Sequence, residues 1–328
     1  MTPQRRSRLM LLGAYAATWI IWGSTYLAIR VAVQSVPPFL LVGVRSLTAG
    51  AILCAWARLR GEPLPSRGQW LAALLTGTLF FLVGHGGLFW AEQRVASGPA
   101  ALMIATEHFW IVLLPWLFGG PRASGRALAG IALGLAGVGA LTLGTGGGRM
   151  DPTGTVVLLV ASAAWSVGTL YYRPPRKPAS PLFAAGAPLI TGGVLLFPTS
   201  LVSGELRGFH LADATPNALL ALAYLIVFGS VVAFTAYSWL VEREGPGRAL
   251  SFTYVNPLVA VLLGWAVLGE QLTIRIVIAG LAIVAAVVLI INGIAAESSS
   301  PRTASVDTED GADPSRIPHP KRRVARMR

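Results

Sequence analysis

Long apolar runs divided by short polar breaks make up most of the chain. A helix that crosses a bilayer needs about 20 mostly apolar residues, and ten runs of about this length follow one another before residue 294. They lie at residues 9–33, 39–57, 70–90, 96–119, 126–144, 153–172, 179–202, 217–240, 246–269 and 273–293. The breaks hold Pro, Gly and Arg and are too short for a soluble domain. The pattern predicts an all-α membrane protein with ten transmembrane helices.

Composition agrees with this interpretation. Of the 328 residues, 54% are hydrophobic and only 12% are charged, a balance that is rare in soluble domains. The net charge of +12 does not indicate nucleic acid binding, because the basic residues separate apolar runs instead of clustering on one soluble face. From Glu297 onward the chain is polar and ends in a basic segment, so residues 294–328 are predicted to form a disordered cytoplasmic tail.

The distribution of Lys and Arg predicts the orientation, since these residues prefer cytoplasmic loops. With the N-terminus inside, the inner loops hold most of the basic residues and the outer loops hold few. The inner set is Arg5, Arg6, Arg8, Arg58, Arg60, Arg67, Arg122, Arg126, Arg173, Arg176, Lys177, Arg243 and Arg248, against Arg94, Arg149, Arg207 and Arg275 outside. Both termini are therefore expected on the cytoplasmic side.

The second half of the chain repeats features of the first at an offset of about 143 to 150 residues. Trp22 aligns with Trp165, and Glu107 aligns with Asn256. The predicted repeats are residues 9–144 and 153–293, with five helices each. Because five is odd, the second repeat enters the membrane from the opposite side. This predicts two inverted repeats related by a pseudo-two-fold axis in the membrane plane, with a site near the midplane where they meet.

Glu107 and His108 lie side by side near the middle of the fourth apolar run. A charge at the bilayer centre costs roughly 3 kcal/mol, so such residues face a partner or a wet cavity. Neighbouring side chains on a helix diverge by about 100°, so both cannot face the same cavity. We expect Glu107 to line the cavity, where burial favours exchange of a proton. The candidate neighbours are Arg30, Arg45, His85 and Asn256. A purely structural ion pair is the alternative.

Aromatic residues and a proline flank the repeat-matched positions. Four of them are candidates to line a cavity for a flat or cationic substrate, although aromatic residues also form belts at membrane interfaces: Trp22, Trp110, Trp165 and Tyr254. Pro257 lacks an amide hydrogen and is predicted to kink the ninth helix. That kink either frees carbonyl groups for a ligand or only serves helix packing.

Several motifs resemble those of the EamA family, within the drug/metabolite transporter superfamily. The motifs are Trp22-Gly23-Ser24-Thr25, Gly98-Pro99-Ala100-Ala101-Leu102, Ala105-Thr106 followed by Trp110, and Tyr254-Val255-Asn256-Pro257 with Gly269-Glu270. The resemblance extends over residues 9–293. The resemblance implies a carrier whose cavity is built from the first four helices of each half. The fifth and tenth helices are then peripheral, packed through the small residues Gly130, Gly134, Ala282 and Ala286. His108 departs from the family pattern, which has proline there, so we expect the kink only at Pro257.

The resemblance implies an inner-membrane secondary transporter. We expect an exporter of a small metabolite, such as an amino acid, purine or drug-like compound, that works by alternating access with proton exchange. A carrier of a nucleotide sugar or lipid-linked intermediate and a non-transporting membrane scaffold are the alternatives. No phosphate-binding loop, zinc motif or cysteine pair is present, so we expect no enzyme, cofactor or metal. The expected partners are a small-molecule substrate, the lipid bilayer and protons, with a homodimer as a candidate assembly.

Overall fold

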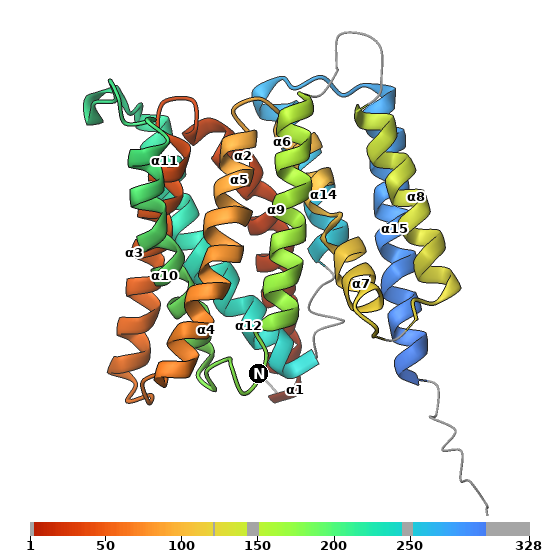
Figure 1. Cartoon of the computed structure of the whole chain (residues 1–328), viewed down its shortest axis with the longest axis horizontal. Helices are drawn as coiled ribbons and strands as arrows, with labels where there is room; N and C mark the ends of the chain where they lie inside the picture. The colour runs from red at the N-terminus through yellow and green to blue at the C-terminus, as the bar shows by residue number, and fades with distance from the viewer. Residues whose placement is uncertain (1–2, 121, 143–150, 245–251, 300–328) are drawn as a thin grey trace, which may run out of the picture.

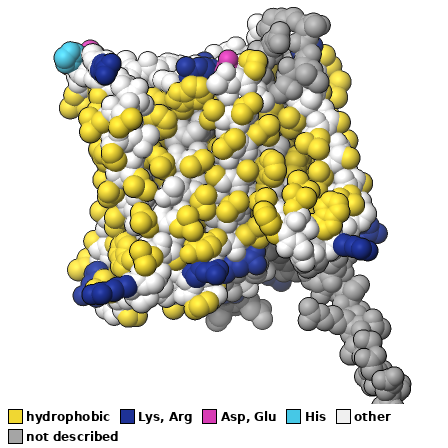
Figure 2. All heavy atoms as spheres, in the orientation of Figure 1, with side chains coloured by type: hydrophobic (Ala, Val, Ile, Leu, Met, Phe, Trp, Pro, Cys, Tyr) yellow, Lys and Arg dark blue, Asp and Glu magenta, His cyan; other side chains and the backbone are white. Residues whose placement is uncertain are grey.

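The structure, a computed structural model, describes residues 3–120, 122–142, 151–244 and 252–299, and every regular element in these ranges is helical (Figure 1). The helices stand side by side in one bundle, with α8 and α15 together at one edge. Figure 2 shows a broad hydrophobic band across one face, with Lys and Arg gathered along its edges. The predicted all-helical membrane architecture is confirmed.

Six helical stretches are long and apolar enough to cross a membrane. Within the described residues they are Pro38–Leu59, Arg67–Ala91, Ser97–Leu117, Pro152–Tyr171, Pro181–Val202 and Pro216–Tyr237. Shorter apolar helices cover Gly125–Ala140, Val255–Leu268 and Ile274–Ile290. The presence of ten membrane spans and the orientation of the termini remain predictions.

Several segments of the first half consist of more than one helix. The elements are α1 (Pro3–Ala16), η1 (Ala17–Ile21), α2 (Trp22–Ala32), α3 (Pro38–Leu59), α4 (Arg67–Gly77), η2 (Thr78–His85), α5 (Gly86–Ala91), α6 (Ser97–Ile104), α7 (Glu107–Leu117) and α8 (Gly125–Thr142). Here η1 and η2 are π-helical segments inside longer helices. The fourth predicted run is interrupted between α6 and α7.

The second half has the same general order. Its elements are α9 (Pro152–Tyr171), α10 (Pro181–Val202), the 3₁₀ turn η3 (Leu211–Asp213), α11 (Pro216–Tyr224), the π-helical segment η4 (Leu225–Val232), α12 (Ala233–Glu244), α14 (Phe252–Leu268) and α15 (Ile274–Ser299). Helix α15 runs past the predicted end at residue 293. The rest of the predicted tail, residues 300–328, lies outside the described residues.

Contacts between the two halves follow a reciprocal pattern. Helix α3 packs along α10, and α8 packs along α15, so equivalent helices of the two halves lie together. Helix α2 contacts α11, and the equivalent pair α9 and η2 is also in contact. The π-helical segments η2 and η4 occupy equivalent positions in the two halves. The halves are therefore interleaved, and the core lies between them.

Two glutamates hold the starts of equivalent helices across the two halves. The carboxylate of Glu205, which follows α10, accepts the amide hydrogens of Phe39 (3.2 Å) and Leu40 (2.8 Å) at the start of α3. Glu62, which follows α3, accepts the hydroxyl hydrogen of Ser180, the N-cap of α10. The first amides of a helix lack intrahelical acceptors, so a carboxylate there stabilises the helix. Each half thus supports the start of a helix in the other half, Glu205 directly at two amides and Glu62 through the N-cap residue Ser180.

The edge pair α8 and α15 packs through small residues, as expected. A Cβ atom on Gly130 would come within 2.8 Å of the Ala286 carbonyl oxygen, so only glycine permits this approach. A Cβ atom on Gly137 would lie 3.3 Å from the Ala282 Cβ atom. Gly134 instead faces the Phe109 ring of α7. Close approach of this kind is typical of packing between membrane helices.

Candidate functional site

A cavity of about 100 Å³ lies inside the bundle and takes its walls from both halves. The volume is enough for several water molecules or part of a small metabolite. Its lining residues are Trp22, Thr25, Tyr26, Ile29, Arg45, Gly84, His85, Leu88, Ala101, Ile104, Ala105, Glu107, Ala161, Ser162, Trp165, Phe234, Phe252, Asn256 and Pro257.

Most of the predicted site residues meet at this cavity. Those that line it are Trp22, Arg45, His85, Glu107, Trp165, Asn256 and Pro257. Trp110 is not among the lining residues, but its indole Nε1–H donates to the Oγ atom of the lining residue Ser162 at 3.1 Å. His108 is buried beside the cavity without lining it. The side chain of Tyr254 lies outside the described part of the chain.

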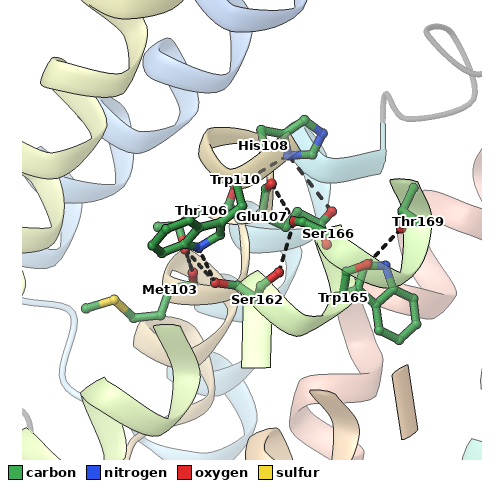
Figure 3. A network of polar contacts seen from close by, with 10 residues as sticks. Met103, Thr106, Glu107, His108, Trp110, Ser162, Trp165, Ser166 and Thr169 are labelled. Atoms are coloured by element: carbon green, nitrogen blue, oxygen red, sulfur yellow. Dashed lines mark hydrogen bonds and ion pairs between the residues drawn. The ribbon is translucent and has the colours of Figure 1, made fainter. Parts of the chain in front are cut away.

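The break between α6 and α7 places Glu107 at the cavity wall. Around Thr106 the backbone bonds run from residue i to i−3: Thr106 N donates to Met103 O (3.1 Å), and Phe109 N donates to Thr106 O (2.9 Å). Hydroxyl groups bond carbonyls at the break, since Thr106 Oγ1 donates to Met103 O (2.6 Å) and Ser166 Oγ donates to Glu107 O (2.7 Å) (Figure 3). The turn is therefore closed by side chains of α9 and of the break itself.

Glu107 and His108 point in different directions, as the helical geometry predicts. The shortest polar contact given for the Glu107 carboxylate in the described structure is to His108 Nδ1 at 3.9 Å, too long for a hydrogen bond. His108 Nδ1 lies 3.4 Å from Ala105 O. Its Nε2 atom is buried without a partner among the described residues. Among the described residues, Glu107 is thus a cavity carboxyl group without a close hydrogen-bond partner.

Arg45 places a buried guanidinium group at the same cavity. Its side chain is 3% exposed, and Nε donates to Ser230 Oγ at 2.9 Å. The group lies 5.6 Å from the Phe89 ring centroid. Its Nη1 atom has no hydrogen-bond partner in the described structure. No ion pair joins Arg45 to Glu107 within the described residues, although this pair was a candidate from the sequence.

Two groups of aromatic side chains form walls of the cavity. Trp22 packs against Phe234, Tyr237 and Phe252, with centroids 4.6 to 5.4 Å apart, and its Nε1–H donates to Gly229 O at 2.9 Å in η4. Trp165 stacks on Phe80 at 4.3 Å and lies 5.0 Å from the His85 ring. The repeat-matched tryptophans therefore stand in two aromatic clusters.

Asn256 and Pro257 connect the ninth predicted segment to the first. With the side-chain amide of Asn256 oriented so that its nitrogen faces the two carbonyls, it donates to Trp19 O (3.0 Å) in η1 and to Phe252 O (3.1 Å). Helix α14 continues through Pro257, whereas the break at the equivalent level lies between α6 and α7. We expected a kink only at Pro257, but the fourth segment is irregular as well, and the kink at Pro257 itself remains a prediction. The physical reason is that hydroxyl groups stabilise the α6–α7 break without a proline.

Some residues at the site were not singled out from the sequence. Tyr26 lines the cavity one turn after Trp22, and Ser162 lines it one turn before Trp165. Helical spacing from the two tryptophans could have indicated both positions. Ser230, which accepts a hydrogen bond from Arg45, could not be identified from spacing. It lies in η4, which is far from α3 in the sequence and contacts it only in the folded structure. Among the described residues, no cluster of three His, Cys, Asp or Glu side chains could hold a metal ion.

The fold and the cavity define a polytopic α-helical membrane protein built around a buried site with few polar groups. Comparison with known proteins identifies the family. The profile of the EamA-like transporter family matches residues 9–143 and again residues 152–292. The chain therefore belongs to the EamA-like transporter family, and its interpretation as a transporter and not an enzyme is confirmed.

Individual proteins agree with this assignment. The uncharacterized inner membrane transporter YedA of Escherichia coli K12 is 39% identical over 82% of this chain and 86% of its own length. The uncharacterized transporter YvbV of Bacillus subtilis is 26% identical over 94% of this chain and 98% of its length. A solved crystal structure matches with a TM-score of 0.61 and 21% identity, covering 86% of this chain and 96% of that one. The last match supports the fold alone.

Proposed function

We propose that the protein is a ten-helix secondary transporter of the bacterial inner membrane, with two inverted five-helix repeats and both termini in the cytoplasm. The two family matches and the reciprocal helix contacts support the repeats. The name of YedA supports the inner membrane. Basic residues of the described loops support the orientation, because Arg58, Arg60, Arg176 and Lys177 lie at the end where the chain starts.

The substrate that fits the cavity best is a small zwitterion such as an amino acid. The observation that carries this proposal is the presence of Arg45 and Glu107 at one cavity without an ion pair between them. Buried charges are costly unless they are paired. A carboxylate on the substrate would pair with Arg45, and its ammonium group would pair with Glu107. The aromatic walls around Trp22 and Trp165 would contact its side chain.

Proton exchange follows from the same arrangement. When the substrate ammonium leaves Glu107, a proton can neutralise the buried carboxylate in its place. Substrate and proton then occupy Glu107 in turn, which would couple export of the metabolite to entry of a proton by alternating access. The candidate homodimer has no role in this scheme and remains a prediction.

A nucleotide-sugar carrier is less well supported. A substrate with two phosphate groups needs several cationic side chains, and Arg45 is the only Arg or Lys in the described lining of the cavity. The scaffold alternative depends on the tail instead of the cavity. Deleting residues 297–328 separates these roles, because a transporter should keep its flux and a scaffold should lose its function.

The test is thermal unfolding of purified protein in detergent against amino acids, purines, sugars and organic cations. A ligand at a hundred times its Kd stabilises the folded state by about 2.7 kcal/mol. We expect amino acids to raise the midpoint of the wild type, and we expect Arg45→Gln and Glu107→Gln each to abolish the increase. Arg207→Gln, in an exposed loop, is the charge-matched control and should keep it.

Other outcomes would change the assignment. Stabilisation by amino acids that persists in both cavity variants would place the binding site elsewhere. Stabilisation by organic cations that only Glu107→Gln abolishes would indicate a cationic substrate, with Arg45 in a structural role.

A further inference from the structure

Glu92 is a buried carboxyl group that the cavity mechanism does not use. It directly follows α5 and is fully buried, with an exposed fraction of 0%. Neither carboxyl oxygen has a hydrogen-bond partner in the described structure. An unpaired carboxylate in such a place would be very costly. The structure therefore favours a neutral, protonated Glu92.

The surroundings of Glu92 contain charged groups that do not pair with it. Arg30 of α2 donates a hydrogen bond to the backbone carbonyl of Glu92, and no ion pair joins the two side chains among the described residues. Glu270, which follows α14, is occupied by the start of α6: it accepts from Ser97 N (2.9 Å), Ser97 Oγ (2.9 Å) and Gly98 N (3.3 Å). Burial raises the pKa of Glu92 well above its ordinary value; Glu270 adds to the shift and Arg30 opposes it.

Glu92 lies next to the cavity. Its amide donates to the carbonyl of Leu88 (2.9 Å), one turn earlier, and Leu88 lines the cavity. Tyr26 also lines the cavity, and it belongs to α2, the helix whose Arg30 bonds the backbone carbonyl of Glu92. On the other side, the exposed Arg94 follows Glu92 by two residues. Glu92 therefore stands between the cavity and the loop end of the bundle.

The comparison with Glu205 shows that Glu92 is not a helix cap. Glu205 is also buried in part at a loop end, but its carboxylate is bonded to two amides and to Ser200 Oγ at 2.5 Å. Glu92 follows a helix C-terminus, where a negative charge is unfavourable. A structural acceptor would have bonded a donor at this place, as Glu205 and Glu270 do.

We propose that Glu92 is a second proton-binding site, which keeps its proton while Glu270 holds the start of α6 and releases it when this end of the bundle opens. The proton then passes to water at the loop end, and the carboxylate left behind pairs with the guanidinium of Arg30. Closing reverses both steps. The coupling to transport rests on the function proposed above, whereas proton binding by Glu92 does not.

The first experiment measures the proton directly on full-length protein in detergent. Infrared difference spectra across pH report the C=O stretch of protonated carboxyl groups. We expect a band at neutral pH in the wild type that Glu92→Gln lacks, and that Glu107→Gln and Glu205→Gln keep. Identical spectra of the wild type and Glu92→Gln would overturn the proposal, because Glu92 would then be ionised.

Thermal unfolding shows whether Glu92→Gln folds, and its pH dependence gives a second test of proton binding by Glu92. A carboxyl group with a raised pKa stabilises the fold fully below its ordinary pKa and loses this contribution as the pH rises through the raised value. The wild type should therefore lose stability relative to Glu92→Gln as the pH increases. A constant difference between the two proteins over the whole range would contradict the proposal.

The last measurement addresses coupling in proteoliposomes with and without a pH gradient. Glu92→Gln should bind an amino acid as the wild type does. The pH gradient should accelerate transport by the wild type but accelerate transport by Glu92→Gln far less. If acceleration is unchanged while the infrared band is absent, the proton is structural and the coupling role is wrong. If the wild type transports nothing, the proposed function fails, and the infrared result still decides whether Glu92 binds a proton.

Discussion

The hydroxyl groups of Thr106, Ser162 and Ser166 decide the shape of the cavity wall at the residue scale. They meet at the α6–α7 break, where Ser166 bonds both Glu107 O and Ser162 O (2.7 and 3.0 Å) and Thr106 bonds Ser162 at 3.0 Å. A buried carbonyl needs a donor in a nonpolar environment. These hydroxyls accompany the turn of the backbone out of its helix, and Ser166 adds a hydrogen bond to the carbonyl of Glu107, the first residue of α7.

Removing one hydroxyl should therefore destabilise the break. Ser166→Ala removes this hydrogen bond to the Glu107 carbonyl, and loss of one buried hydrogen bond costs about 0.5 to 1.5 kcal/mol. We expect a decrease of that size in the free energy of unfolding, measured in detergent. Thr169→Val is the control: its hydroxyl bonds Trp165 O within its own helix, so the effect should be much smaller. Equal losses in both variants would contradict this account of the break.

The sequence indicated individual site residues where depth alone made them unusual. Glu107 and Arg45 are charged residues inside apolar runs, and both line the cavity. Glu92 escaped notice because it stands at the end of a run, where an acidic residue is ordinary. Its burial depends on α2 and on the loop after α14, which lie far away in the sequence. The partners of a side chain, unlike its depth, become visible only in the folded chain.

At the scale of elements, α8 owes its position to a glycine that faces a ring. Phe109 is buried in a small cluster with Ile131, Ala286 and Ile290. A Cβ atom on Gly134 would come within 1.9 Å of the ring's Cζ atom. The absence of a side chain at Gly134 therefore lets α8 approach α7 just after the break that carries Glu107.

Gly134→Ala should push the two helices apart. The Phe109 ring is buried against Ile131, Ala286 and Ile290, and overpacking of this kind costs about 1 to 3 kcal/mol. We expect a lower unfolding midpoint in detergent. Gly125→Ala lies at the start of the same helix and has no atom within 4 Å of the new Cβ, so it should be neutral or slightly stabilising. A neutral Gly134→Ala would show that the contact is looser than the structure indicates.

Apolar runs predicted where helices lie far better than they predicted helix irregularities. Most described helices coincide with the expected runs, because burial in lipid dictates their length and composition. The π-helical segments η2 and η4 were not predicted; neither contains proline, although each contains a glycine, Gly84 and Gly229. The α6–α7 break also occurs without proline. These irregularities depend on acceptors and donors from neighbouring helices, such as Trp22 bonding Gly229 O in η4.

At the scale of the whole molecule, orientation in the membrane is the largest untested prediction. It rests on the number of Lys and Arg residues in each loop, because these residues prefer cytoplasmic loops. In the described part, Arg176 lies in the α9–α10 loop and Arg207 in the α10–α11 loop, at opposite ends of α10. Both are exposed, so both positions can be tested chemically.

Cysteine labelling gives the test, since Cys54 is the only cysteine in the chain. In a Cys54→Ser background, Arg207→Cys should react with a membrane-impermeant maleimide on intact cells. Arg176→Cys should react only after the membrane is opened. Labelling of Arg176→Cys on intact cells would reverse the proposed orientation, and labelling of both would show two orientations.

The caps that Glu62 and Glu205 provide change how loop variants should be interpreted. A substitution near Glu205 weakens the start of α3, which belongs to the other half, and a substitution near Glu62 weakens the start of α10. In a map of mutational effects, damage would therefore appear in the half that was not altered. Genetic suppressors of a loop variant should be sought across the bundle, at the helix whose start has been weakened.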